Sequence, residues 1–150
     1  MKHLITKFKK DQLAIIYTLE KANRTGVNTT GGKNLVKEAR RKISNHIEFD
    51  VYQLKTKIAK DPQNFKSEKT KIIIKRLMIY QNELNRFSRK FSEFTGANLG
   101  ASVQLRHLSY DFSNLVANLR QRFQKDENEI VSALNFLELR DDLDDDSKTY

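Results

Sequence analysis

Apolar residues recur at spacings of three and four along most of the chain, which is the period that places them on one face of an α-helix. Four stretches carry this pattern, at residues 3–22, 33–60, 65–95 and 102–138. In the second stretch the apolar positions are Val36, Ala39, Ile43, Ile47, Val51, Leu54 and Ile58. The pattern predicts four amphipathic helices and an all-α fold.

Helix-breaking residues fall between these stretches. A segment rich in glycine and threonine, residues 24–32, follows the first stretch, Asp61-Pro62 ends the second, and Gly96 and Gly100 follow the third. Four helices joined by short connections pack most simply as an up-down-up-down antiparallel four-helix bundle. We therefore expect one domain over residues 1–138, and a disordered, aspartate-rich tail over residues 139–150 because that segment offers no apolar face.

The charge of the chain is unevenly distributed. The whole sequence has a net charge of +9, but the tail holds five aspartates, so residues 1–138 contain 26 basic and 14 acidic residues, a net charge of +12. Such a charge favours an acidic protein partner, nucleic acid or anionic lipid through long-range attraction. The lysines are spread over all four stretches and no stretch forms a basic arm, so a solvated lysine-rich surface is the simpler explanation of the charge.

Several classes of chemistry find no support in the sequence. The absence of cysteine excludes disulfides, thiolate metal sites and thiol catalysis. We find no phosphate-binding loop, nucleophile elbow or zinc pattern, and so predict neither catalytic residues nor an enzyme. No window approaches the roughly 20 apolar residues of a membrane span, and the first residues lack a signal-peptide pattern. We therefore expect a cytoplasmic protein; the oligomeric state is not indicated.

A group of polar residues lies on or beside the predicted apolar faces. Burying them costs free energy unless they find partners. His46 and Asp50 are four residues apart, which puts both on one helical face, the geometry by which helical bundles bind iron. A lone histidine on an apolar face is, however, more often a satisfied core residue than a metal ligand. The full group is Gln12, His46, Asp50, Glu83, Arg122 and Asp126.

Four segments resemble bacterial hemerythrin-like (HHE) domains, and the similarity extends over residues 5–137. These segments are residues 11–15, 25–29, 39–52 and 119–127. The resemblance implies that His46 and Asp50 match the His-x-x-x-Glu pair of the family's second helix. It also implies that the histidine of the first helix is replaced by Gln12. The corresponding pair of the fourth helix is represented by Arg122 and Asp126.

The resemblance also implies that the family's di-iron centre is lost. Such a centre uses about five histidines and bridging carboxylates, whereas this chain has three histidines in all, and the Glu83 region lacks the expected one. We therefore expect no cofactor. Because arginine stays protonated, our hypothesis is that Arg122 stands where a metal stood and pairs with Asp50, Asp126 or Glu83. The alternative is a weak mononuclear iron site of His46, Asp50 and Glu83.

Residues 111–116 and 122–130 are also similar to the last helix of the bacterial regulator of sigma D, a metal-free helical bundle that binds a sigma factor. This likeness covers about twenty residues and serves as analogy only. The sequence thus leaves three functions open. We expect first a non-enzymatic interaction or regulatory protein with an acidic protein partner. The alternatives are a metal or oxygen sensor with a reduced site, and sequence-independent nucleic-acid binding.

Overall fold

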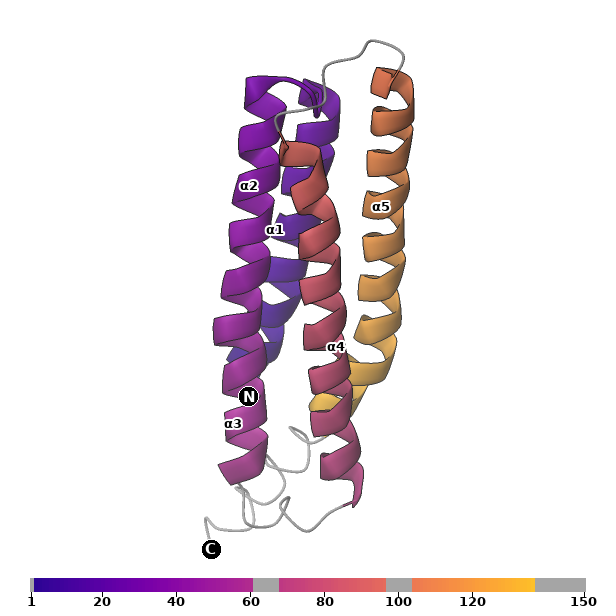
Figure 1. Cartoon of the computed structure of the whole chain (residues 1–150). Coiled ribbons are helices and arrows are strands. Elements are labelled where there is room, and N and C mark those ends of the chain that lie inside the picture. Colours follow the sequence, from indigo (N-terminus) through magenta and orange to yellow (C-terminus); the bar gives the residue numbers. More distant parts are fainter. Residues whose placement is uncertain (1, 61–67, 97–103, 137–150) are drawn as a thin grey trace, which may run out of the picture.

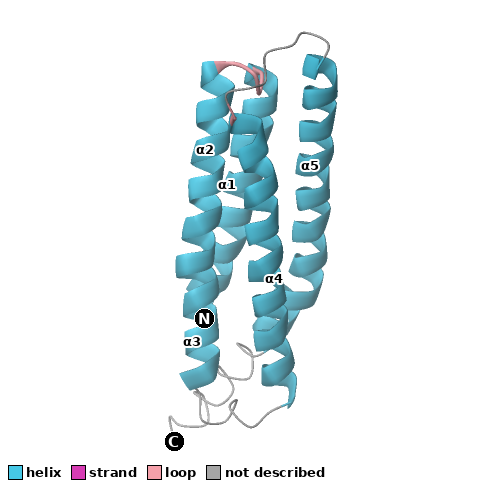
Figure 2. Cartoon of the chain, viewed as in Figure 1, coloured by secondary structure: helices cyan, strands magenta, loops and turns pink. Residues whose placement is uncertain are grey.

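The computed structural model describes residues 2–60, 68–96 and 104–136 (Figures 1 and 2). All of these residues are helical except the turn at residues 26–29 and Gly96. This confirms the all-α prediction for the described residues. The helices are α1 (Lys2–Thr25), α2 (Thr30–Asn45), η1 (His46–Val51), α3 (Tyr52–Lys60), α4 (Glu68–Ser92), η2 (Glu93–Thr95), α5 (Gln104–Asp126) and η3 (Glu127–Val131). The helix then continues to residue 136.

These elements form four long rods, because α2, η1 and α3 are continuous, and so are α5, η3 and residues 132–136. The rods lie side by side (Figure 1), with α1 packed most extensively against α2. Their bounds match the four predicted stretches within a few residues. The predicted tail, residues 139–150, lies outside the described residues.

The rods bury one continuous apolar core, built from the faces that the sequence pattern predicts. All seven apolar positions predicted for the second helix are buried. The largest fully buried side chains come from all four rods: Phe8, Ile15, Leu19, Ile43, Leu54, Ile58, Leu77, Tyr80, Leu84, Phe91, Phe112 and Leu119. No described helix combines the length and the apolarity that crossing a membrane requires.

The turn between α1 and α2 depends on its glycines. Gly26 has φ +102°, a conformation that L side chains rarely adopt. Thr29 then caps α2, because its side-chain oxygen accepts a hydrogen bond from the Gly32 backbone N–H at 3.0 Å. A Cβ atom on Gly32 would lie 1.8 Å from the Gly26 carbonyl oxygen, whereas on Gly31 its nearest contact would be 3.3 Å.

Gly32→Ala is therefore expected to lower the free energy of unfolding by about 2–3 kcal/mol, because the α1–α2 turn must move to admit the methyl group. Gly31→Ala is the matched control and should change it by less than about 1 kcal/mol. Urea denaturation of both variants measures the difference. Equal effects at the two positions would show that the contact with Gly26 does not limit the packing.

Two of the rods contain a single π-helical turn, which the sequence pattern did not predict. In a regular α-helix, residues four apart drift by about 40° around the axis. Ile43, Ile47 and Val51 are spaced by four, yet all three are buried. The wider turn of η1 absorbs the drift and keeps this face on the core. Such turns occur frequently at functional sites, and here η1 begins at His46 and η3 follows directly after Asp126.

Candidate functional site: a buried charge network

The centre of the candidate site is the pair formed by His46 and Asp50 on the π turn η1. Both residues are buried, with 1% and 3% of their surface exposed. The Nδ1 atom of His46 lies 2.6 Å from Oδ2 of Asp50. An ionised carboxylate only accepts hydrogen bonds, so Nδ1 is the nitrogen that carries the proton in this contact. The predicted pairing of the two side chains on one helical face is therefore present.

The other ring nitrogen of His46 connects the pair to α4 and α1. His46 Nε2 lies 2.6 Å from the hydroxyl of Tyr80, which is fully buried, and Gln12 Nε2 donates to the same hydroxyl at 3.0 Å. In a neutral imidazole, Nε2 accepts the Tyr80 proton when Nδ1 is protonated. Gln12, Tyr80, His46 and Asp50 then form one chain in which each group donates to the next.

Aromatic rings surround this series of hydrogen-bonded side chains. The Phe8 ring centroid lies 4.7 Å from that of His46 and 5.3 Å from that of Tyr80, while the Phe123 centroid lies 6.2 Å from that of Tyr80. These rings exclude water, so a polar group here that lost its partner would not regain one from solvent. Burial raises the pKa of the Tyr80 hydroxyl well above its ordinary value, which keeps it protonated as a donor.

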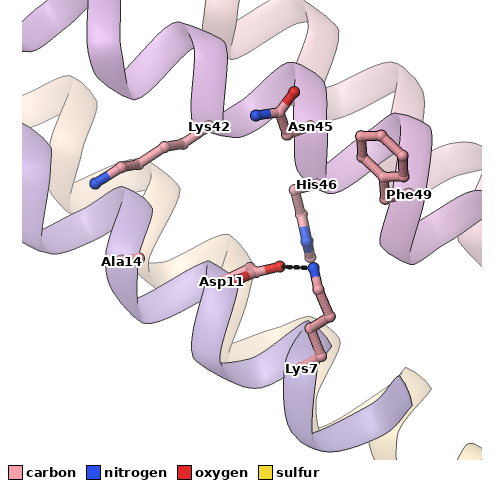
Figure 3. A pocket seen from close by; sticks show the side chains of 7 residues that line it. All are labelled: Lys7, Asp11, Ala14, Lys42, Asn45, His46 and Phe49. Carbon is pink, nitrogen blue, oxygen red and sulfur yellow. Dashed lines mark hydrogen bonds and ion pairs between the residues drawn. The ribbon is translucent and has the colours of Figure 1, made fainter. Parts of the chain in front are cut away.

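The series of hydrogen bonds ends at Lys7, whose side chain extends inward from the surface to Asp50. Lys7 Nζ lies 2.6 Å from Asp50 Oδ1 and 2.6 Å from Asp11 Oδ2, although its side chain is 55% exposed. Figure 3 shows Lys7 and Asp11 in contact beside the His46 ring, in a pocket of about 280 Å³ that α1 and the α2–η1 rod line. The Lys7 ammonium thus supplies the positive charge that a pair of buried or half-buried carboxylates requires.

The contacts set the charge states of the network. Burial alone would raise the pKa of Asp50, but the contacts with His46, Asp11 and Lys7 outweigh it and lower the pKa to about 2. The pKa of Asp11 is raised, chiefly by burial and by its neighbour Asp50. The hydrogen bonds to Asp11 and Asp50 raise the pKa of Lys7. At neutral pH the network therefore contains an ionised Asp50 next to a protonated Lys7.

A second polar pair lies on α5. Arg122 Nε is 3.3 Å from Asp126 Oδ2, but within the described residues neither atom has a hydrogen bond of acceptable geometry. Asp126 is 1% exposed, and its burial raises its pKa to about 6 despite the favourable charge of Arg122. The predicted pairing of Arg122 with Asp126 is present, but it is an ion pair of poor geometry.

The structure brings together two of the four predicted metal ligands, His46 and Asp50, but not Glu83 or Asp126. Among the described residues, one group could hold a metal ion, Asp11, His46 and Asp50, whose ligand atoms lie within 4.8 Å of one another. Neither Glu83 nor Asp126 belongs to it. Glu83 is half-buried on α4 and pairs with Arg86 at 3.7 Å. The described ion pairs of Asp50 involve Lys7 and His46 and not Arg122.

The donor atoms of this group are already in use. Both ring nitrogens of His46 and both oxygens of Asp50 have partners, and Lys7 lies between the two carboxylates. A metal ion there would have to displace the Lys7 ammonium and break the bond between His46 and Asp50. In the arrangement seen, these donor atoms are bonded to one another, to Tyr80 and to Lys7.

Comparisons with models of protein families, with curated proteins and with solved structures gave no match. The predicted resemblance to hemerythrin-like domains and to the regulator of sigma D stays a prediction.

Sequence reasoning missed three members of the network, Lys7, Asp11 and Tyr80. A signal for each was present. Tyr80 occupies a core-facing position of α4, and a buried tyrosine hydroxyl needs a partner. Lys7 and Asp11 are four residues apart on α1, the spacing of a helical ion pair. That Lys7 also reaches Asp50, 43 residues away, depends on the packing of α1 against η1, which no local pattern gives.

Proposed function

We propose that this chain is a non-enzymatic interaction or regulatory protein, an up-down-up-down antiparallel four-helix bundle of hemerythrin-like type that has lost the di-iron site. The observation that carries the proposal is the position of Lys7. Its ammonium lies 2.6 Å from carboxylate oxygens of both Asp11 and Asp50, within the single metal-capable group of the described residues. A charge on the protein's own side chain thus occupies the place that a metal cation would need.

The rest of the network supports the same conclusion. Catalysis by acid or base needs a titratable group within hydrogen-bonding reach of a substrate. His46 and Tyr80 are instead bonded to each other and enclosed by Phe8 and Phe123. A polar network whose members satisfy one another stabilises and specifies a core. The function then lies on the outer surface, where a net charge of +12 over residues 1–138 attracts an acidic protein partner.

The interaction is tested by immobilising the full-length chain and passing cell lysate over it at low ionic strength, then raising the salt. We expect an acidic protein to be retained at about 0.05 M salt and released as the Debye length shortens at several-fold higher salt. A surface-charge control, the variant Lys37→Gln/Lys57→Gln/Lys75→Gln at exposed positions, should retain less. No retained protein at either salt concentration would contradict the proposed function.

A second candidate function, a metal or oxygen sensor with a reduced site, is favoured by one observation. The ligand atoms of Asp11, His46 and Asp50 lie within 4.8 Å of one another. Both candidates can be tested by titrating the metal-stripped protein with Fe²⁺ and Zn²⁺. We expect no saturable binding to the wild-type chain, and a gain of binding in Lys7→Met, because that variant exposes two carboxylates without their cation.

His46→Ala in the Lys7→Met background is the control and should abolish the gained binding. If the wild-type chain itself binds the metal in a saturable manner and His46→Ala removes that binding, the sensor function is favoured over the proposed one. A tightly retained metal would also protect the wild-type chain against thermal unfolding.

A further inference from the structure

A second cleft lies between α2 and α4. Its volume is about 630 Å³, and it is lined mostly by polar residues. We call it the arginine cleft, after Arg40 of α2 and Arg86 and Arg89 of α4, which line it together with Glu83 and two amides, Asn82 and Asn85. Two serines complete the lining.

The charges in the arginine cleft are unbalanced. Three guanidinium groups face one carboxylate, that of Glu83, which is 32% exposed and lies 3.7 Å from Arg86 Nη1. The Nε atom of Arg40 donates to Ser88 Oγ at 3.3 Å across the cleft, which holds its guanidinium against α4. Arg86 and Arg89 are three residues apart and so share one face of the helix. Planar guanidinium forks suit carboxylate or phosphate groups.

The other lining residues distinguish between these ligands. The lining contains no aromatic side chain on which a base could stack. Glu83 opposes any anionic ligand, so it does not distinguish a peptide from a nucleic acid. The amides of Asn82 and Asn85 each donate and accept hydrogen bonds, which matches the N–H and C=O groups of a peptide backbone. The missing aromatic platform disfavours nucleic acid and the two amides match a peptide backbone, so the lining favours an acidic peptide.

We propose that the arginine cleft is the docking site for an acidic peptide segment of the partner. Its carboxylates bind Arg40, Arg86 and Arg89, and its backbone bonds to the two amides. The inference rests on the proposed function, since it names the surface and the partner chemistry through which that function would act. It does not depend on the state of the buried network.

The site is tested with a short, fluorescently labelled peptide of alternating glutamate and alanine, by fluorescence anisotropy on the full-length chain at low ionic strength. The variant Arg40→Gln/Arg86→Gln/Arg89→Gln should weaken peptide binding by about tenfold or more. The matched control is Arg24→Gln/Arg41→Gln/Arg76→Gln, which removes the same charge from exposed positions outside the cleft. It should weaken binding by less than about threefold.

A third variant, Glu83→Gln, should tighten peptide binding about threefold, because it removes the one carboxylate that faces the ligand. Circular dichroism melts would be used to check that all variants fold. Equal weakening by the two triple variants would overturn the inference in favour of diffuse charge. If the cleft variant bound a single-stranded RNA more weakly than wild type but bound the peptide equally well, the inference would be overturned in favour of nucleic acid.

Failure of the cleft and failure of the proposed function give different results. If the cleft variant still retains the same acidic protein from lysate with unchanged salt dependence, the partner docks elsewhere and only the cleft inference fails. If the wild-type chain retains no protein, the proposed function fails, whatever the synthetic peptide does.

Discussion

Replacing Asp50 with alanine is expected to lower the free energy of unfolding at neutral pH by about 3 kcal/mol. Asp50 accepts hydrogen bonds from both His46 and Lys7, and it is 3% exposed. Its removal leaves the buried Nδ1–H of His46 without an acceptor, which carries the full desolvation cost of that group. The expected loss lies at the low end for a broken buried pair because Lys7, at 55% exposure, regains solvent. Urea denaturation measures the change.

Two further variants make this result specific. Asp11→Ala removes only the more exposed contact of Lys7 and should cost less than about 1 kcal/mol. Tyr80→Phe removes the hydroxyl that joins Gln12 to His46 and should cost about 1–2 kcal/mol. If Asp50→Ala proved as mild as Asp11→Ala, Asp50 could not be the centre of the network.

The pH dependence gives an independent measure of Asp50. Its pKa is about 2 in the folded chain and about 3.9 in the unfolded chain, so its ionised form is favoured by folding. This stabilisation is present above about pH 4 and is lost as the pH falls through 2. The wild-type chain should therefore lose stability over this interval, and Asp50→Ala should lose less.

Asp126→Asn is expected to raise the free energy of unfolding at pH 7 by about 2 kcal/mol, the second large effect. Burial raises the pKa of Asp126 to about 6, and Arg122 and Lys125 only partly oppose this, while Glu129 and Glu83 add to it. Folding thus favours the protonated form. The stabilisation from protonation is fully present below about pH 4 and is lost as the pH rises through 6.

In the Asp126→Asn variant the side chain at position 126 stays neutral at every pH. This variant should therefore lack the decline in stability between pH 4 and pH 6. Thermal denaturation at a series of pH values compares it with the wild-type chain. Glu129→Gln, which removes an exposed neighbouring carboxylate on η3, is the control and should leave most of the decline in place. A variant less stable than wild type at pH 7 would show that the charge on Asp126 is needed by Arg122.

The helices were predictable because the spacing of apolar residues determines which face of each helix is buried. Ile43, Ile47 and Val51 were placed on the core correctly without any knowledge of the partner helices. The π turn at η1 was not predictable. The spacing of four residues is visible in the sequence, but the packing that keeps all of these residues on the core is not. The burial of His46, Asp50, Asp126 and Gln12 followed from the same pattern.

The partners of these residues were less predictable, because they depend on which side chains meet across the core. The resemblance to hemerythrin-like domains favoured Arg122 as the internal cation, since it placed Arg122 at a metal-ligand position. The structure pairs Arg122 with Asp126 and gives the role beside Asp50 to Lys7. A lysine can do this from a half-exposed position, because its long apolar stem lets the charged end reach a distant carboxylate.

The buried network and the arginine cleft assign separate tasks to the molecule. In the network of Lys7, Asp50, His46 and Tyr80, the polar groups satisfy one another without an added cation. The cleft between α2 and α4 presents unbalanced positive charge at the surface. Substitutions in the first are expected to change stability and its pH dependence, whereas those in the second should change binding alone.

The most direct test of the internal cation is the metal content of untagged, full-length protein purified from cells grown with added iron. Because the Lys7 ammonium lies between Asp11 and Asp50, we expect far less than one metal ion per chain and an unchanged melting temperature after treatment with a chelator. Near-stoichiometric iron with a charge-transfer absorption band, lost together with stability on chelation, would contradict this and restore a metal centre at His46.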